Sequence, residues 1–324
     1  MGNNRFLLIK AKGGMGNRML CAITGLLYAR ATDRTPVVDW SDGTYSNDGS
    51  NAFSGYFETT TAQLSALPVD TNYVPALWKG TTEKPLSYLI QTNDPTKHSS
   101  PLIHRKYSID CRRLDYTEQV AVFWYYTHRL NQLLPALRNT PLDSYTQLGV
   151  RGSIRELLSR DMKLVPEIRM KVDEFKARHW KAPMIGLHIR CTDLKTDLGA
   201  YRKALDRLLT QVPDATLFLA TDNAQVMEDY IARYPRVVST PKWLPAGVHS
   251  LHQNAACPDR FANGVEALLD MYLLAECDYL IYPGSSTFSW IAGIMAGLDE
   301  AHLIDVERHH LIRKAKRWFR DLLP

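Results

Sequence analysis

The chain has 324 residues, of which 45% are hydrophobic and 23% are charged, and its formal net charge is +5. This length favours two domains over a single core, and the composition excludes a disordered or fibrous chain. The mild positive charge fits an anionic small ligand or an acidic membrane surface, and we predict no nucleic acid partner.

Cysteine usage and the apolar pattern indicate a cytoplasmic protein. The five cysteines are odd in number and form no C-x-x-C pair, which supports neither a disulfide framework nor a zinc site. The apolar stretch near the N-terminus is too short for a signal peptide, and no run approaches the roughly 20 apolar residues of a membrane helix. We therefore expect neither a bound metal nor a spanning helix.

The first segments predict a parallel βαβ unit. A strand over 6–12 leads through the turn GGMGN to a helix over 18–33 and a second strand over 35–40. GGMGN lacks the lysine of a P-loop and the third glycine of a dinucleotide fingerprint. A glycine turn before a helix still suits close approach of a ligand, which makes Gly14, Gly16 and Asn17 candidate contacts. The polar residues 41–56 then predict a long functional loop.

The middle of the chain is less regular. We assign no elements over 57–112 and expect one helix within 117–138 and another over 164–180. The segment 181–183 ends the second of these helices, and we place a domain boundary beside it. The expected domains are 1–178 and 179–324.

The second domain alternates strands with helices, which predicts a second parallel sheet. The expected strands cover 184–190, 216–221, 236–239, 278–283 and 301–306. The expected helices cover 199–212, 224–234, 262–276 and a stretch from about Ser286, and a basic helix ends the chain.

Polar clusters follow three of these strands, at the sheet edge where ligands of open α/β folds bind. The clusters are His188, Arg190 and Asp193; Thr221 and Asp222; and Ser285 and Ser286 at a helix start that favours phosphate. Arg190 would add a permanently charged, bidentate partner, and Asp270 needs a partner inside an apolar helix. The structural alternatives are a helix cap for the serines, a core histidine and turn-forming aspartates.

Taken in order, the motifs resemble one family. GLHIRCTD is similar to the H-x-R-R-T-D segment of the fucosyltransferase superfamily, particularly the α-1,6-fucosyltransferases of the NodZ type. The likeness extends to GGMGNRMLCAITGLLYARATDRTPVVDW, NAFSGYF, ATDN and LLDMYLLAECDYLIYPGSSTFS. It implies an α/β GT-B architecture, with two Rossmann-like domains facing each other across a cleft. It also implies a GDP-sugar donor on the second domain, an acceptor on the first, and inversion without a required metal or other cofactor.

The resemblance further implies roles for individual residues. Arg190 matches the arginine at the donor's β-phosphate, and Asp193 matches an organiser of Arg190. Contacts to the nucleoside are implied for His188, Asp222 and Asp270, and contacts to the diphosphate for Ser285, Ser286 and Thr287.

Two positions depart from the family pattern. Cys191 stands where the family has a second arginine, and we expect it to pack structurally rather than to act as a nucleophile. Leu198 stands where related enzymes carry a glutamate that is a candidate general base. Asp197, beside it, is the candidate replacement, and transfer without a side-chain base is the alternative.

These observations predict an inverting glycosyltransferase that moves fucose or a related sugar from GDP-fucose to an oligosaccharide hydroxyl. The acceptor would lie in the cleft, against loop 41–56. The alternatives are a transferase of the same fold with another nucleotide sugar, and a non-catalytic glycan- or nucleotide-binding protein. A Rossmann oxidoreductase ranks last, because the three-glycine fingerprint is absent. The basic C-terminal helix predicts either packing against the first domain or peripheral contact with the inner face of the membrane.

Overall fold

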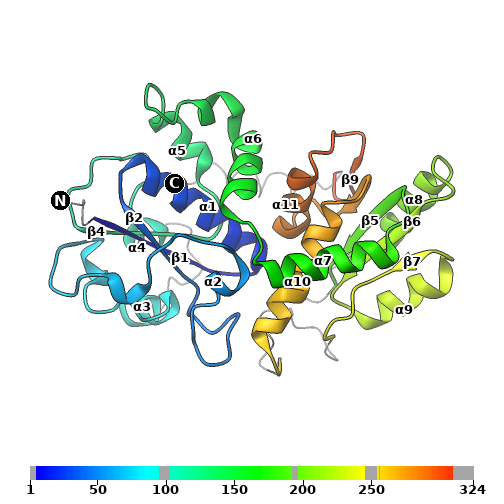
Figure 1. Ribbon diagram of the computed structural model, residues 1–324, viewed down its shortest axis with the longest axis horizontal. Helices are drawn as coiled ribbons and strands as arrows, with labels where there is room; N and C mark the ends of the chain where they lie inside the picture. Colours follow the sequence, from blue (N-terminus) through cyan, green and yellow to red (C-terminus); the bar gives the residue numbers. More distant parts are fainter. Residues whose placement is uncertain (1–4, 95–102, 192–195, 245–253, 255, 309–324) are drawn as a thin grey trace. The chain divides into compact units, whose positions relative to one another are not determined.

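The computed structural model describes residues 5–94, 103–191, 196–244, 254 and 256–308 (Figure 1). The chain divides into two compact units, one ending at Lys163 and the next beginning at Leu164. This division falls earlier than the boundary at 178/179 expected from the sequence. Helix α7 (Pro166–His179) therefore lies with the second unit.

The first unit contains a four-stranded parallel sheet in the order β2-β1-β4-β3. Its strands are β1 (Phe6–Ala11), β2 (Thr35–Asp39), β3 (Tyr73–Val74) and β4 (Val120–Tyr125). Helix α1 (Met15–Ala31) connects β1 to β2, which confirms the predicted βαβ unit. This helix is buried along almost its whole length, and its buried residues include the charged Arg18.

The helix predicted within 117–138 is wrong over its first half, because β4 occupies that stretch. The strand VAVFWY is buried at every position, so its sequence lacks the alternation of apolar and polar residues that is typical of a half-exposed strand. The β-branched and aromatic residues were the one feature of this segment that favoured a strand over a helix. The remaining helices of this unit are α2 (Phe53–Tyr56), α3 (Leu86–Asn93), α4 (Ile103–Tyr107), α5 (Leu130–Ala136) and α6 (Ser144–Asp161), with short 3₁₀ turns at Leu64–Ala66 and Ala76–Trp78.

The second unit contains a five-stranded parallel sheet in the order β7-β6-β5-β8-β9. Its strands are β5 (Met184–Ile189), β6 (Thr216–Thr221), β7 (Val237–Val238), β8 (Tyr279–Tyr282) and β9 (Leu303–Asp305). Its other helices are α8 (Leu198–Leu209), α9 (Ala224–Arg233), α10 (Arg260–Leu274) and α11 (Thr287–Ala296). The predicted alternation over 184–306 is confirmed.

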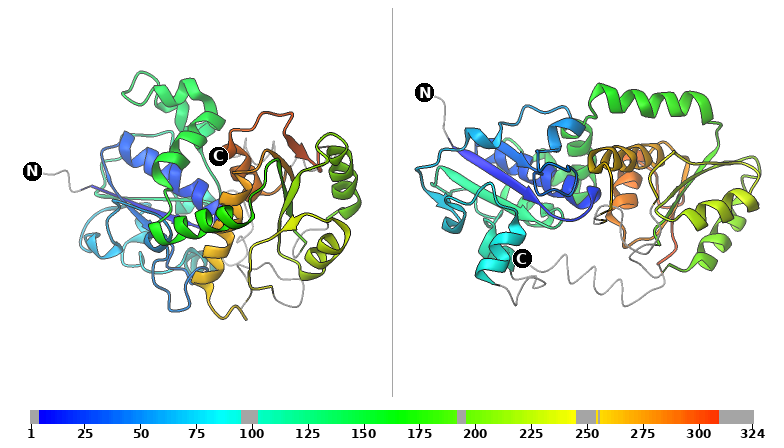
Figure 2. Two further views of the ribbon diagram at one scale, coloured as in Figure 1. Left: turned by 45° about the vertical axis from the view of Figure 1, so that its right-hand side comes forward. Right: turned by 90° about the horizontal axis from the view of Figure 1, so that it is seen from below.

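Alternate residues of β5 face the two layers of helices. Ile185, Leu187 and Ile189 pack in a cluster with side chains of α8 and α9. On the other face, a Cβ at Gly186 would lie 3.0 Å from Leu274 of α10, which shows how closely that helix approaches the strand. Figures 1 and 2 show the helices and strands of this unit as ribbons. His188 points to the same face as Gly186, away from the cluster formed with α8 and α9, and its side-chain neighbours therefore come from this second layer of helices.

No helix in the described ranges has the length and apolar content needed to cross a bilayer. The basic helix predicted at the C-terminus lies outside the described residues.

Candidate functional site

The strand order of the second sheet reverses between β5 and β8. From β5 the chain proceeds outward to β6 and β7, and it then returns to add β8 and β9 on the other side. Such a switch point leaves room for a ligand at the carboxyl ends of the two central strands. Arg190 follows β5, Asp222 follows β6, and the serine turn follows β8. The topology therefore brings all three predicted clusters to one edge of the sheet.

His188 is buried near the end of β5 and contacts helix α11. Its Nδ1 lies 2.9 Å from the Ser289 hydroxyl, and its ring stacks on Phe288 with centroids 5.0 Å apart. Burial lowers the pKa of His188 to about 3, and the nearby cations Arg190 and Lys242 act in the same direction. The imidazole is therefore neutral at physiological pH.

This buried histidine makes stability depend on pH. Because its folded-state pKa is depressed from 6.5 to about 3, the unfolded chain binds the proton more readily between these values. The contribution is fully present above about pH 6.5 and should decline by about 1.4 kcal/mol per pH unit as the pH falls through this window. Urea unfolding between pH 7.5 and 5 should show a steeper loss for the natural chain than for His188→Gln. Parallel profiles would contradict the burial of a neutral imidazole.

Asp222 holds the backbone that follows Arg190. Its Oδ1 accepts a hydrogen bond of 2.8 Å from the amide of Cys191. Burial, together with the neighbouring Asp222 carboxylate, raises the pKa of the half-buried Cys191 thiol. A protonated thiol that packs against the β5–α8–α9 cluster fits the structural interpretation of Cys191.

Two further aspartates are predicted at this site, Asp193 as an organiser of Arg190 and Asp197 as a candidate general base. Asp193 lies outside the described residues. Asp197 is exposed and is the N-cap of α8, where its Oδ1 accepts a hydrogen bond of 3.1 Å from the Ala200 amide. Asp197 therefore caps helix α8, and a catalytic role for this residue stays a prediction.

The turn between β8 and α11 contains an unsatisfied hydroxyl. Ser286 is only 3% exposed, and its Oγ has no hydrogen-bond partner among the described residues although Ser286 occupies the N-cap position. Ser285 is exposed, and Thr287 is half-buried as the first residue of the helix. A buried hydroxyl that lacks a partner at a helix N-terminus is suited to contact an anionic group.

Two carboxylates that the sequence analysis missed also meet this turn. Oδ1 of Asp305 accepts from the Gly284 amide at 2.8 Å, and Oε2 of Glu307 accepts from the Ser285 amide at 2.9 Å. A Cβ at Gly284 would lie 2.1 Å from Asp305, so only glycine fits there. An anion at this turn would share it with these two carboxylates.

The buried carboxylate of Asp270 is paired with side chains of the protein itself. Its Oδ1 accepts from the Thr240 hydroxyl at 2.6 Å, and its Oδ2 forms a buried ion pair with the Lys242 ammonium. The amide of Trp243 donates to Glu266, one turn earlier on α10. Segment 240–243 is thus fixed to α10 at two points. A guanine contact at Asp270 would have to share the carboxylate with Lys242.

The three candidate contacts of the glycine turn belong to the first unit. Gly14 is the N-cap of α1 and has an extended φ of −75°, whereas the left-handed φ of 86° occurs at Gly13. Gly16 and Asn17 are buried in the first turn of the helix, and the Asn17 Oδ1 has no hydrogen-bond partner in the part of the chain that the structure describes. The described part of the chain contains no group of three or more His, Cys, Asp or Glu residues arranged to bind a metal.

Comparison with known proteins identifies the family. A model of the family Nodulation protein Z (NodZ) matches residues 151–316, just over half of the chain. The chain belongs to the NodZ family. This confirms the resemblance inferred from the motifs, and the match includes every candidate site residue of the second unit.

Individual NodZ proteins match over most of the chain. Nodulation protein Z of Bradyrhizobium diazoefficiens is 26% identical over 319 residues, covering 91% of this chain and 80% of that protein. An α-(1,6)-fucosyltransferase of Drosophila melanogaster is 29% identical over 129 residues, which are 35% of this chain and 20% of that protein. A solved structure of a NodZ α-1,6-fucosyltransferase soaked with GDP-fucose superposes with a TM-score of 0.63 at 23% identity, covering 90% of this chain and 92% of that one. The predicted GT-B fold is confirmed.

Proposed function

We propose that this NodZ-family chain is an inverting glycosyltransferase that transfers fucose from GDP-fucose to a hydroxyl of an oligosaccharide. The observation that carries the proposal is the switch point of the second sheet, where Arg190 and the unsatisfied Ser286 hydroxyl follow the two central strands. Family membership and the fucosyltransferase relatives support the same reaction.

The proposed chemistry depends on charge that grows on the leaving GDP. Arg190 supplies a fixed cation for the diphosphate, and the amino-terminal end of α11 supplies Ser285, Ser286 and Thr287. These groups would provide the counter-charge that other transferases take from a metal ion, so the proposal includes no metal. The neutral ring of His188 and the carboxylates of Asp222 and Asp270 are assigned to the nucleoside.

The acceptor hydroxyl would attack the sugar carbon from the face opposite GDP, which inverts its configuration. Its proton would pass to Asp197 or directly to solvent, while Asp193 would organise Arg190. We assign the donor to the second unit, with Gly14, Gly16 and Asn17 as further contacts, and the acceptor to the first unit. The five cysteines, all free, are compatible with the proposed cytoplasmic location.

Nucleotide binding gives the first test. GDP at about 100 times its Kd should stabilise the chain by about 2.7 kcal/mol, visible as a higher Tm, whereas UDP and ADP at the same concentration should shift it less. Incubation with GDP-fucose and an oligosaccharide should release GDP and extend the acceptor. Preference for UDP or ADP would overturn the donor assignment. Retention of donor with no release of GDP would identify a binding protein instead.

A further inference from the structure

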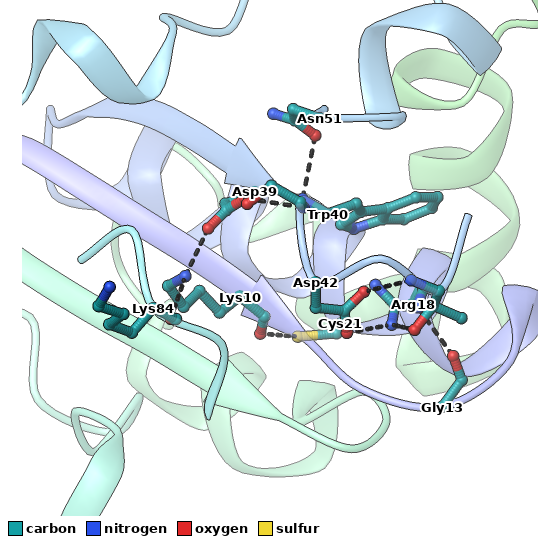
Figure 3. Close-up of polar contacts among 11 residues, drawn as sticks. Lys10, Gly13, Arg18, Cys21, Asp39, Trp40, Asp42, Asn51 and Lys84 are labelled. Carbon is teal, nitrogen blue, oxygen red and sulfur yellow. Dashed lines mark hydrogen bonds and ion pairs between the residues drawn. The ribbon is translucent and has the colours of Figure 1, made fainter. Parts of the chain in front are cut away.

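A buried arginine joins two segments of the first unit that lie far apart in the sequence. Arg18 follows the glycine turn directly and has an exposure of 0%. Its Nε donates to the Gly13 carbonyl at 2.8 Å, and its Nη2 donates to Oδ2 of Asp42 at 2.6 Å and to the Thr44 hydroxyl at 2.8 Å (Figure 3). One guanidinium therefore connects the turn before α1 to the loop that follows β2.

The aromatic side chains around Arg18 belong to the same loop. Its Cζ lies 5.8 Å from the ring of Trp40 and 5.4 Å from the ring of Tyr45. Such contacts stabilise a cation that has been removed from water. Burial would raise the pKa of Asp42, but the Arg18 guanidinium and the hydrogen bonds from Thr44 outweigh it and lower that pKa. The pair is thus ionised at neutral pH.

A second anchor holds the far end of this loop. The Oδ1 of Asn51 accepts a hydrogen bond of 3.0 Å from the backbone amide of Trp40 (Figure 3). The same oxygen accepts from the amide of Phe53 at 3.2 Å, and the Asn51 side-chain amide donates to the Val38 carbonyl at 2.6 Å. Residues 47–50 lie between the two anchors and are exposed. This tip, Asn-Asp-Gly-Ser, presents amide, carboxylate and hydroxyl groups, which are the groups that hydrogen-bond a hydroxyl-rich ligand.

We propose that Arg18 is a positioning residue for the acceptor. By fixing loop 41–52 to the glycine turn, it holds the tip 47–50 in the conformation that contacts the oligosaccharide. A pre-organised loop loses less entropy on binding, so releasing it should weaken acceptor binding. The inference rests on the proposed function, because it assigns one loop of the first unit to the acceptor.

The test compares acceptor-dependent and acceptor-independent reactions of the same variants. Arg18→Lys keeps the charge but cannot reach three acceptors. Asp42→Asn removes the charge on the loop side and replaces one of the two accepting oxygens with an NH2 donor. Both should raise the KM for the oligosaccharide by about tenfold, which corresponds to about 1.4 kcal/mol. In Asp42→Asn, which keeps the hydrogen bond from Arg18 to the Gly13 carbonyl and so leaves the glycine turn in place, the KM for GDP-fucose in slow hydrolysis without acceptor should stay unchanged. Amide hydrogen exchange over 41–46 should become faster in both variants.

Arg30→Lys is the matched control. Arg30 lies on the same helix and forms a two-pronged pair with Asp161, at 3.0 and 2.9 Å, near the opposite end of α1. This variant should change neither KM nor exchange over 41–46. If Arg18→Lys fails to fold, Asp42→Asn tests the inference by the same measurements, the acceptor KM and amide hydrogen exchange over 41–46.

Three results would overturn the inference. An unchanged acceptor KM in a variant whose loop exchanges faster would show that the loop does not position the acceptor. A parallel rise in the KM of donor and acceptor in Asp42→Asn would show a general structural role. A natural chain that transfers no fucose would overturn the proposed function together with the inference, and that failure is recognised in the natural chain before any variant is compared.

Discussion

Replacing Arg190 with alanine should lower kcat for fucosyl transfer by about 10² to 10³-fold, the loss seen when one preorganised donor to a developing oxyanion is removed. The reason is that negative charge grows on the departing diphosphate in the transition state. A permanent cation beyond the end of β5 stabilises this charge more than it stabilises the bound substrate. Arg190→Lys should recover part of the rate, because an ammonium keeps the charge but loses the bidentate geometry. Steady-state rates of GDP release measure both effects.

The control for Arg190 is an arginine of the same unit with an exposed ion pair. Arg236 precedes β7 and lies 3.4 Å from Asp214, and these side chains are 45% and 88% exposed. Arg236→Ala should leave kcat unchanged, because Arg236 precedes its strand and therefore lies away from the carboxyl edge of the parallel sheet. Near-normal turnover of Arg190→Ala would contradict the assignment of the donor site.

Replacing Lys242 with methionine should lower the free energy of unfolding by about 3–5 kcal/mol, because it leaves the carboxylate of Asp270 buried without its counter-charge. The side chains of Lys242 and Asp270 are only 3% and 9% exposed, so water cannot solvate the remaining charge. Urea unfolding, followed by a probe in the second unit, measures the loss. Lys242→Met combined with Asp270→Leu should recover much of it, since two apolar residues replace the pair.

A second lysine pair of the same unit provides the control. Lys176 of α7 forms an ion pair of 2.7 Å with Glu276, but these side chains are 29% and 37% exposed. Lys176→Met should therefore cost at most about 1 kcal/mol. Equal losses for the two methionine variants would show that Asp270 is compensated by something other than Lys242.

Local sequence patterns predict one unit better than the other, and the reason is physical. In the second unit, strands and helices alternate at short range, so each element carries its own periodicity. In the first unit, β4 lies between β1 and β3 and is buried on both faces, and its sequence carries no alternation to distinguish it from a buried helix. The boundary between units lies close to one end of α7, where helical periodicity carries no information about which core the helix joins.

In the candidate site, local sequence likewise predicts the positions of the residues but not the side chains with which they pair. The positions of Arg190, Asp222 and Ser286 at strand ends follow from local sequence, because a strand's end is a local property. Their neighbours do not: Lys242 is 28 residues from Asp270, and Ser289 is 101 residues from His188. Only the fold determines which of many lysines and serines completes each contact.

The contact between His188 and Ser289 also fixes what the ring can offer to a ligand. A neutral imidazole carries one proton, and a hydroxyl that donates to Nδ1 leaves this proton on Nε2, whereas a hydroxyl that accepts leaves Nε2 bare. The rotation of one O–H bond on α11 thus sets the tautomer of a residue on β5. The hydrogen-bond polarity at the end of that strand is consequently determined by a serine that need not touch the ligand itself.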